Sequence, residues 1–178
     1  MKTPTAKRSR LILILGGAAS GKSQAALDRA GRIGPKAFVA TGQALDGEMK
    51  ARIARHRETR SPDWITAEVP RELAGWFRSD GHAYRTIVVD CLTLWLSNVG
   101  GRRIAQTDVT GLVDDLLQAI RVIPAKVVLV SNELGFGLVP AVRSARVFRD
   151  VAGRVNQQIA HAADEVYMVI SGQSLRLK

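Results

Sequence analysis

The stretch "GGAASGKS", residues 16–23, constrains the fold of this chain more than any other segment. It fits the pattern G-x-x-x-x-G-K-[ST], follows the apolar run "LILIL" and precedes the helix-like "QAALDRAG". Glycines allow a tight turn that points successive backbone N–H groups at one anion, and the N-terminus of the next helix adds further donors. Because both flanking contexts match, we interpret the stretch as a phosphate-binding loop rather than an ordinary glycine turn.

Every residue of this loop is predicted to contact a nucleotide: Gly16, Gly17, Ala18, Ala19, Ser20, Gly21, Lys22 and Ser23. Lys22 is expected to reach the β- and γ-phosphates and to act in catalysis, and Ser23 to coordinate Mg²⁺. Such a loop also requires an acid at the end of a neighbouring strand. The segment "TIVVD" places Asp90 there, and we expect Asp90 to bind the metal and to serve catalysis. The alternative is that Asp90 only caps a helix starting at Cys91.

The rest of the chain alternates between strand-like and helix-like patterns. Strands are predicted at 36–41, 64–69, 86–90, 126–133 and 166–171, and helices at 46–58, 70–78, 107–120 and 143–165. The last residues, "SLRLK", are expected to form a hairpin arm. This order predicts an α/β domain with a mostly parallel sheet flanked by helices. We expect one domain over residues 11–178, preceded by a basic flexible tail over residues 1–10.

Composition narrows the classes of function. The net charge is +10, but six of the basic residues lie at the two ends of the chain, where we expect them to be solvated. Only 5% of the residues are aromatic, and no basic stretch alternates with aromatics, so nucleic acid is an unlikely partner and a nucleotide is favoured. There is no apolar run of membrane-spanning length, and the single cysteine, Cys91, fits a reducing cytoplasm.

A second feature is the basic stretch "ARIARHRETR", residues 51–60, which surrounds His56 with arginines. By itself it is consistent with a solvated helix surface or with an imidazole held beside an anion. Neighbouring cations lower the pKa of a histidine and keep it neutral, as a nucleophile must be. On a helix, Glu48, Arg52 and His56 would share one face, so Glu48 is a candidate to orient the imidazole.

Several motifs together resemble one known family. From about Leu11 to the C-terminus the chain carries, in order, "GGAASGKS", "DGEMKARIARHR", "DCLTLWLSN", "SNELGFGLVP" and "GRVNQQIA". This combination is similar to the bifunctional adenosylcobinamide kinase / adenosylcobinamide-phosphate guanylyltransferases of cobalamin biosynthesis. The resemblance implies a RecA-like P-loop NTPase domain, phosphorylation of the aminopropanol hydroxyl of adenosylcobinamide by ATP or GTP, and a homotrimer. It also implies transfer of GMP from GTP, through a histidine, to adenosylcobinamide phosphate.

The same resemblance assigns further residues by position. His56 falls on the histidine that carries GMP, and Glu68 on an acid that contacts guanosine. An acid is a suitable reader of guanine because it accepts from N1–H and N2–H₂ together. Asp90 matches a position that is Glu or Asp in the family, so the shorter side chain leaves the metal or ribose contact open. The remaining nucleotide contacts implied are Ala40, Thr41, Gly42, Arg57, Glu58, Thr59 and Arg60.

Three alternatives stay open at this point. The chain could be a simple P-loop small-molecule kinase in which His56 has no role, or a guanylyltransferase that has lost the kinase step. A basic RecA-like nucleic-acid-binding ATPase is a rival from a different class of protein. The residues that bind the corrinoid and the general base of the kinase step cannot be read from the sequence.

Overall fold

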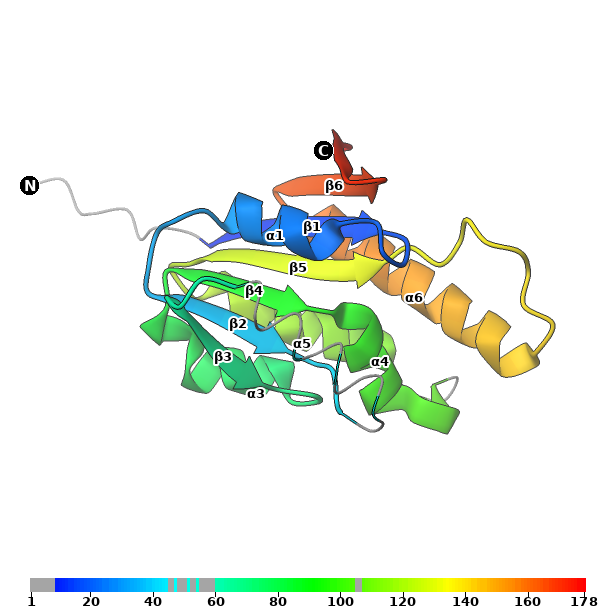
Figure 1. The fold of residues 1–178 in the computed structure, drawn as a ribbon. Coiled ribbons are helices and arrows are strands. Elements are labelled where there is room, and N and C mark those ends of the chain that lie inside the picture. Colours follow the sequence, from blue (N-terminus) through cyan, green and yellow to red (C-terminus); the bar gives the residue numbers. More distant parts are fainter. Residues whose placement is uncertain (1–8, 45–46, 48–50, 52–53, 55–59, 105–106) are drawn as a thin grey trace, which may run out of the picture.

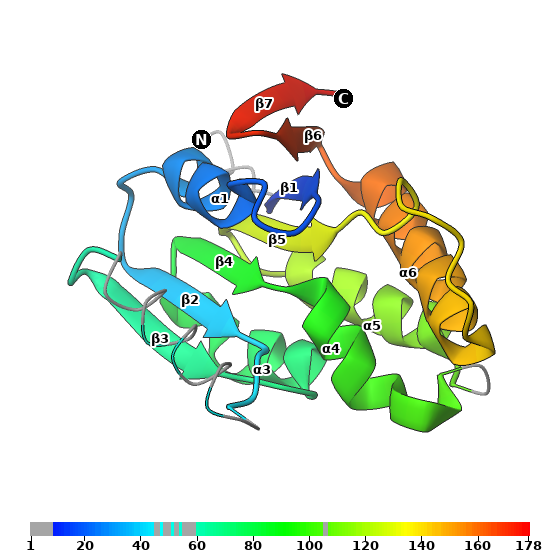
Figure 2. The same ribbon diagram turned by 45° about the vertical axis from the view of Figure 1, so that its right-hand side comes forward.

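A single sheet forms the centre of the fold, and its strand order is β3-β2-β4-β5-β1-β6-β7 (Figures 1 and 2). The computed structural model describes residues 9–44, 47, 51, 54, 60–104 and 107–178. All neighbouring strands in it run parallel except β6 and β7, which are antiparallel. The strands are β1 (Arg10–Gly16), β2 (Lys36–Ala40), β3 (Trp64–Glu68), β4 (Thr86–Asp90), β5 (Lys126–Asn132), β6 (Glu165–Ile170) and β7 (Gln173–Arg176).

Helices cover both faces of the sheet (Figures 1 and 2). Helix α1 packs on one face, whereas α3, α5 and α6 pack on the other, and α4 follows β4 at the carboxyl edge. The helices are α1 (Lys22–Ala30), α3 (Leu73–Ser79), α4 (Leu92–Gly100), α5 (Val109–Arg121) and α6 (Arg143–Ala162), with short 3₁₀ turns at Gly81–Ala83 and Gly101–Arg103. In the described part of the chain, no helix is long and apolar enough to cross a membrane.

The central strands have continuous apolar sequences because the middle of the sheet is buried on both faces. Leu13 and Ile14 of β1 point to opposite faces, and neither side chain is exposed. The same holds for Val127 and Val128 of β5. Burial on both faces is the usual environment of a parallel sheet, so the predicted α/β architecture is confirmed.

Two predicted helix boundaries were wrong. Helix α3 begins at Leu73 rather than at Pro70, because the Pro70 carbonyl accepts a hydrogen bond from α4 and the following residues remain outside the helix. Helix α6 ends at Ala162 rather than at residue 165. Asp164 is instead hydrogen-bonded to β1, because its N–H donates to the Leu11 carbonyl. The predicted helix 46–58 lies almost entirely outside the described residues, although positions 47, 51 and 54 are helical.

Two basic residues near the chain ends, Arg10 and Lys178, are exposed but make defined contacts, whereas residues 1–8 of the expected tail lie outside the described residues. Arg10 is the first residue of β1, and its guanidinium binds the Glu165 carboxylate. The Lys178 ammonium donates to the carbonyls of Ala160, His161 and Ala163 at the end of α6. A cation placed at a helix C-terminus satisfies carbonyls that have no partner within the helix. The expected hairpin arm is confirmed as β6 and β7.

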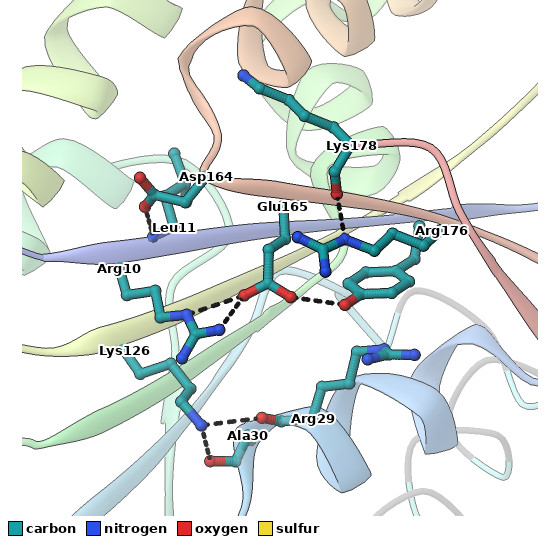
Figure 3. Close-up of polar contacts among 10 residues, drawn as sticks. Arg10, Leu11, Arg29, Ala30, Lys126, Asp164, Glu165, Arg176 and Lys178 are labelled. Atoms are coloured by element: carbon teal, nitrogen blue, oxygen red, sulfur yellow. Dashed lines mark hydrogen bonds and ion pairs between the residues drawn. The ribbon is translucent and has the colours of Figure 1, made fainter.

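A polar cluster ties the chain ends to the sheet (Figure 3). The Glu165 side chain is buried, and one of its oxygens accepts from Arg10 Nε at 2.8 Å while the other accepts from the Tyr167 hydroxyl at 2.5 Å. The Arg29 guanidinium of α1 lies over the Tyr167 ring, 3.4 Å from its centroid. The hydrogen bond from Tyr167 and the Arg10 guanidinium hold the pKa of Glu165 below its ordinary value.

We expect Glu165→Gln to lower the free energy of unfolding at about pH 7 by about 1.5–3 kcal/mol, since hydrogen bonds to a charged group are lost. A carboxyl with a depressed folded-state pKa stabilises fully above its unfolded pKa, near 4.5, and this contribution disappears as the pH falls through the folded-state value. The difference from wild type in urea unfolding should therefore stay constant from about pH 7 to about pH 5 and shrink as the pH falls below about 4.5. The exposed Glu72→Gln is the control, and a loss independent of pH would contradict this account.

Candidate functional site

The phosphate-binding loop turns tightly at the carboxyl end of β1, and two of its glycines are required by close approaches. A Cβ on Gly16 would lie 2.5 Å from Ser20 Oγ and 2.7 Å from the Val169 carbonyl oxygen. Gly21 has a φ of 92°, and a Cβ there would lie 3.2 Å from Gly172 Cα. The backbone therefore comes closer to its neighbours than any side chain would permit.

The turn between β6 and β7 supports this loop from outside, which the sequence did not indicate. The Gly172 N–H donates to the Ser20 carbonyl at 2.9 Å. Ser20 Oγ is buried, and among the described residues it has no hydrogen-bond partner. A buried hydroxyl without a partner at a phosphate-binding loop is a donor that a bound anion can satisfy.

Lys22 and Ser23 lie as the motif predicts. The Lys22 ammonium is buried and donates to the Gly17 carbonyl at 2.9 Å, so it lies across the loop. Ser23 Oγ donates to Asp90 Oδ2 at 2.6 Å, although the two residues are 67 positions apart. The side chain of Asp90 thus faces the loop, and the N-cap of α4 is Cys91 instead. The structure thus places Asp90 beside the phosphate-binding loop and not at the N-cap of α4, and its roles in metal binding and catalysis stay predictions.

Two further predicted nucleotide contacts, Ala40 and Glu68, lie in one row with Asp90 at the ends of neighbouring strands. In the sheet register Ala40 of β2 pairs with Asp90 on one side and with Glu68 of β3 on the other. Glu68, Ala40 and Asp90 therefore end their strands at the same level, with Thr41 and Gly42 directly beyond. Side chains at the carboxyl ends of parallel strands line the ligand crevice of open α/β sheets.

Thr41 is turned inward and joins these strand ends. Its side chain is fully buried, its hydroxyl donates to the Cys91 carbonyl at 2.7 Å and accepts from the Cys91 N–H at 2.8 Å. Its own N–H donates to the Asp90 carbonyl at 3.2 Å. Asn98 of α4 donates to the carbonyls of Thr41 and Pro70, at 2.8 and 3.0 Å. Two side chains thus connect the ends of β2, β3 and β4.

Arg60 is the one charged residue of the basic stretch that lies among the described residues. Its guanidinium lies 3.9 Å from the centroid of the Phe38 ring, and its Nη1 donates to Thr66 Oγ1 at 3.1 Å. These contacts place it over β2 and β3, on the same side of the domain as Glu68. His56, Arg57, Glu58 and Thr59 lie outside the described residues, so their roles stay predictions.

The Cys91 thiol is not a reactive group of this site. Burial, followed by the charge of Asp90, raises the pKa of the Cys91 thiol to about 11. The thiol is therefore protonated at neutral pH and is a poor nucleophile. Cys91 therefore serves as a small buried residue of the core.

Metal binding at this edge would depend on few protein ligands. No group of three or more His, Cys, Asp or Glu side chains suited to a metal occurs in the ranges that the structure describes. The Ser23 and Asp90 oxygens are close enough to share one hard cation, whose other ligands would be phosphate oxygens and water. This arrangement fits Mg²⁺ bound together with a nucleotide.

Glu133 and Asn156 form a second polar group beside the loop. The Glu133 N–H donates to the Gly16 carbonyl at 3.1 Å, so β5 delivers this residue to the start of the loop. Asn156 of α6 is 4% exposed and donates to the Asn132 carbonyl at 3.1 Å. Glu133 lies in the motif "SNELGFGLVP", whereas Asn156 was not singled out from the sequence. The feature of the sequence that could have indicated Asn156 is its polar amide between Val155 and Ile159, which are buried residues of the same helix.

Comparisons with known proteins agree with this geometry. The family model described as cobinamide kinase / cobinamide phosphate guanyltransferase matches residues 12–177. The bifunctional adenosylcobalamin biosynthesis protein CobU of Salmonella typhimurium is 42% identical over 180 residues, which cover 94% of this chain and 99% of CobU. The protein CobP of Pseudomonas aeruginosa, of the same description, is 42% identical over 167 residues, covering 93% and 96% of the two chains.

A solved structure supports the fold independently. The P4 protein from bacteriophage phi6, in complex with ADP, aligns with a TM-score of 0.50 and 15% sequence identity. The alignment covers 98% of this chain and 56% of P4, and at this identity it bears on the fold alone. Because the family model spans nearly the whole chain and the relatives cover it almost completely, this protein belongs to the cobinamide kinase / cobinamide phosphate guanyltransferase family.

Proposed function

We propose that this enzyme phosphorylates adenosylcobinamide with ATP or GTP and then converts the product to adenosylcobinamide-GDP with GTP. The observation that carries the nucleotide chemistry is the contact between Ser23 and Asp90 beneath the phosphate-binding loop. Lys22 and the loop N–H groups stabilise negative charge on the transferring phosphoryl group. The row of Glu68, Ala40 and Asp90 lies beside this loop, where the ribose and base of a nucleotide would extend.

The second reaction proceeds in two displacements in this proposal. A neutral imidazole nitrogen of His56 attacks the α-phosphorus of GTP, a nitrogen–phosphorus bond forms, and pyrophosphate leaves. A phosphate oxygen of adenosylcobinamide phosphate then attacks the same phosphorus and releases His56. In this proposal the arginines next to His56 in the sequence offset charge on the α-phosphoryl group, and Glu68 reads guanine. We further propose, from the family, that the enzyme is a homotrimer that works in the cytoplasm.

The metal site in this proposal depends on Thr41. Asp90 is held at the end of β4, and the hydroxyl of Thr41 bonds both backbone groups of the next residue, Cys91. Removing this hydroxyl would leave the buried Cys91 N–H without its acceptor, although the Cys91 carbonyl would still accept from the Trp95 N–H. It would thereby loosen the position of Asp90 relative to Ser23. In this proposal Thr41 acts as a positioning residue, because its hydroxyl is bonded to the backbone of Cys91.

Covalent guanylylation provides the direct test of His56. Incubation with GTP labelled at the α-phosphate should attach acid-labile label to the wild type and none to His56→Ala, because only the histidine forms the phosphoramidate. The control is His82→Ala, which removes an exposed histidine of the turn Gly81–Ala83 and should label normally. Label that survives in His56→Ala would overturn the role of His56.

Substitution of Thr41 should change the metal dependence of nucleotide binding. We expect Thr41→Val to raise the Mg²⁺ concentration needed for half-maximal binding of a fluorescent GTP analogue by about tenfold, equivalent to about 1.4 kcal/mol. Thr41→Ser, which keeps the hydroxyl, should restore the wild-type value.

The matched control is Thr86→Val at the opposite end of β4. Thr86 is equally buried, and its hydroxyl donates to the Ile33 carbonyl at 2.7 Å. This variant should lose similar stability without any change in Mg²⁺ dependence. Equal Mg²⁺ dependence in Thr41→Val and Thr86→Val would show that Thr41 has no positioning role.

A further inference from the structure

A groove with a volume of about 870 Å³ begins beside the phosphate-binding loop and runs along α6. Its near end is formed by Glu133, Gly135 and Asn156, and its far end by Leu177 and Lys178 at the chain terminus. The volume lies in the range of small-molecule sites. The lining combines apolar side chains with two amides and five charged side chains, which are Glu133, Arg149, Asp150, Arg154 and Lys178. The groove is therefore built like a ligand site, and it lies apart from the row of Glu68, Ala40 and Asp90.

The near end of the groove carries an unsatisfied buried group. Asn156 is 4% exposed, and its Nδ2 donates to the Asn132 carbonyl at 3.1 Å and lies 3.5 Å from Glu133 Oε2. Its Oδ1 is buried, and in the described part of the chain no group donates to it. A buried amide oxygen without a donor is costly unless a ligand or water supplies one.

The Glu133 carboxylate is fixed at the same place. Its Oε1 accepts from the Gly135 N–H at 2.8 Å, and the Glu133 backbone bonds the first residue of the phosphate-binding loop. Because the transferable phosphate lies over this loop, an acceptor entering along the groove would meet it beside Glu133. The adjoining loop also exposes Phe136 and Leu138, whose side chains are 81% and 96% exposed. These side chains offer apolar contact to a large ring system outside the groove.

We propose that this groove binds the hydroxyl-bearing arm of the corrinoid acceptor and that Glu133 is the general base of the kinase step. The inference rests on the proposed function. The proton of the acceptor hydroxyl passes to the Glu133 carboxylate, and the acceptor oxygen forms a bond to the γ-phosphorus. The bond between that phosphorus and the β–γ bridging oxygen breaks, and the nucleoside diphosphate leaves. Asn156 is the positioning residue that orients Glu133. Its Oδ1 accepts a hydrogen bond from the corrinoid substrate.

Two half-reactions of the same enzyme separate this role from nucleotide binding. We expect Glu133→Gln to slow transfer of labelled γ-phosphate from ATP to adenosylcobinamide by about 10²-fold or more, the usual contribution of a general base. Guanylylation of the protein by α-labelled GTP needs no acceptor and should stay within about twofold of wild type. The exposed Glu72→Gln should behave as wild type in both reactions.

The pH profile tests the role of Asn156. In Asn156→Asp a second carboxylate lies beside Glu133, which raises the pKa of the base. The acidic limb of kcat/KM for the kinase step should therefore move to higher pH in this variant and disappear in Glu133→Gln. A loss of folding alone would lower the rate without moving this limb.

Three results would overturn the proposal. The first is a wild-type kinase rate in Glu133→Gln, and the second is loss of guanylylation in that variant together with the kinase step, which would place Glu133 at the nucleotide. The third is an unshifted acidic limb in Asn156→Asp. A wild-type enzyme that performs neither reaction would instead overturn the proposed function, and the acceptor role of the groove with it.

Discussion

The site depends on the parallel register of the sheet. Since β1, β2, β3, β4 and β5 all run in one direction, their carboxyl ends meet at one edge, and residues distant in sequence become neighbours. The hydrogen bond between Ser23 and Asp90 is the clearest product of this arrangement. It joins the first turn of α1 to the end of β4, a strand separated from β1 by β5. A shift of one residue in the register would turn the Asp90 side chain to the other face of the sheet.

The sequence was most informative where chemistry is local. The spacing of Gly16, Gly21, Lys22 and Ser23 within eight residues predicted the phosphate-binding loop, and the apolar run before Asp90 predicted its strand. Buried strands and amphipathic helices were equally visible, because their periodicity is a property of one segment. The boundaries of α3 and α6 were less accurate, since contacts with α4 and with β1 decide where those helices begin and end.

Contacts between distant segments were the part that the sequence could not reveal. Thr41 matched a nucleotide-contacting position, yet its hydroxyl is fully used by Cys91, fifty residues away. Asn98 and Asn156 resemble ordinary helix amides until the backbone carbonyls they satisfy are known. Likewise, the support of Ser20 by Gly172 joins the two ends of the chain. Such pairings follow from tertiary packing. No local pattern within a single sequence reveals them.

The order of the strands also determines how the domain can be assembled during synthesis. Strand β1 leaves the ribosome first but pairs only with β5 and β6, which are among the last segments to emerge. Until then its apolar side chains have no strand beside them, and the phosphate-binding loop lacks the support of the β6–β7 turn. In ribosome-bound intermediates the apolar N-terminal strand would thus stay exposed. A high proportion of the long-range contacts would still have to form. A nascent chain of this topology would therefore complete its phosphate-binding loop only after the β6–β7 turn has formed.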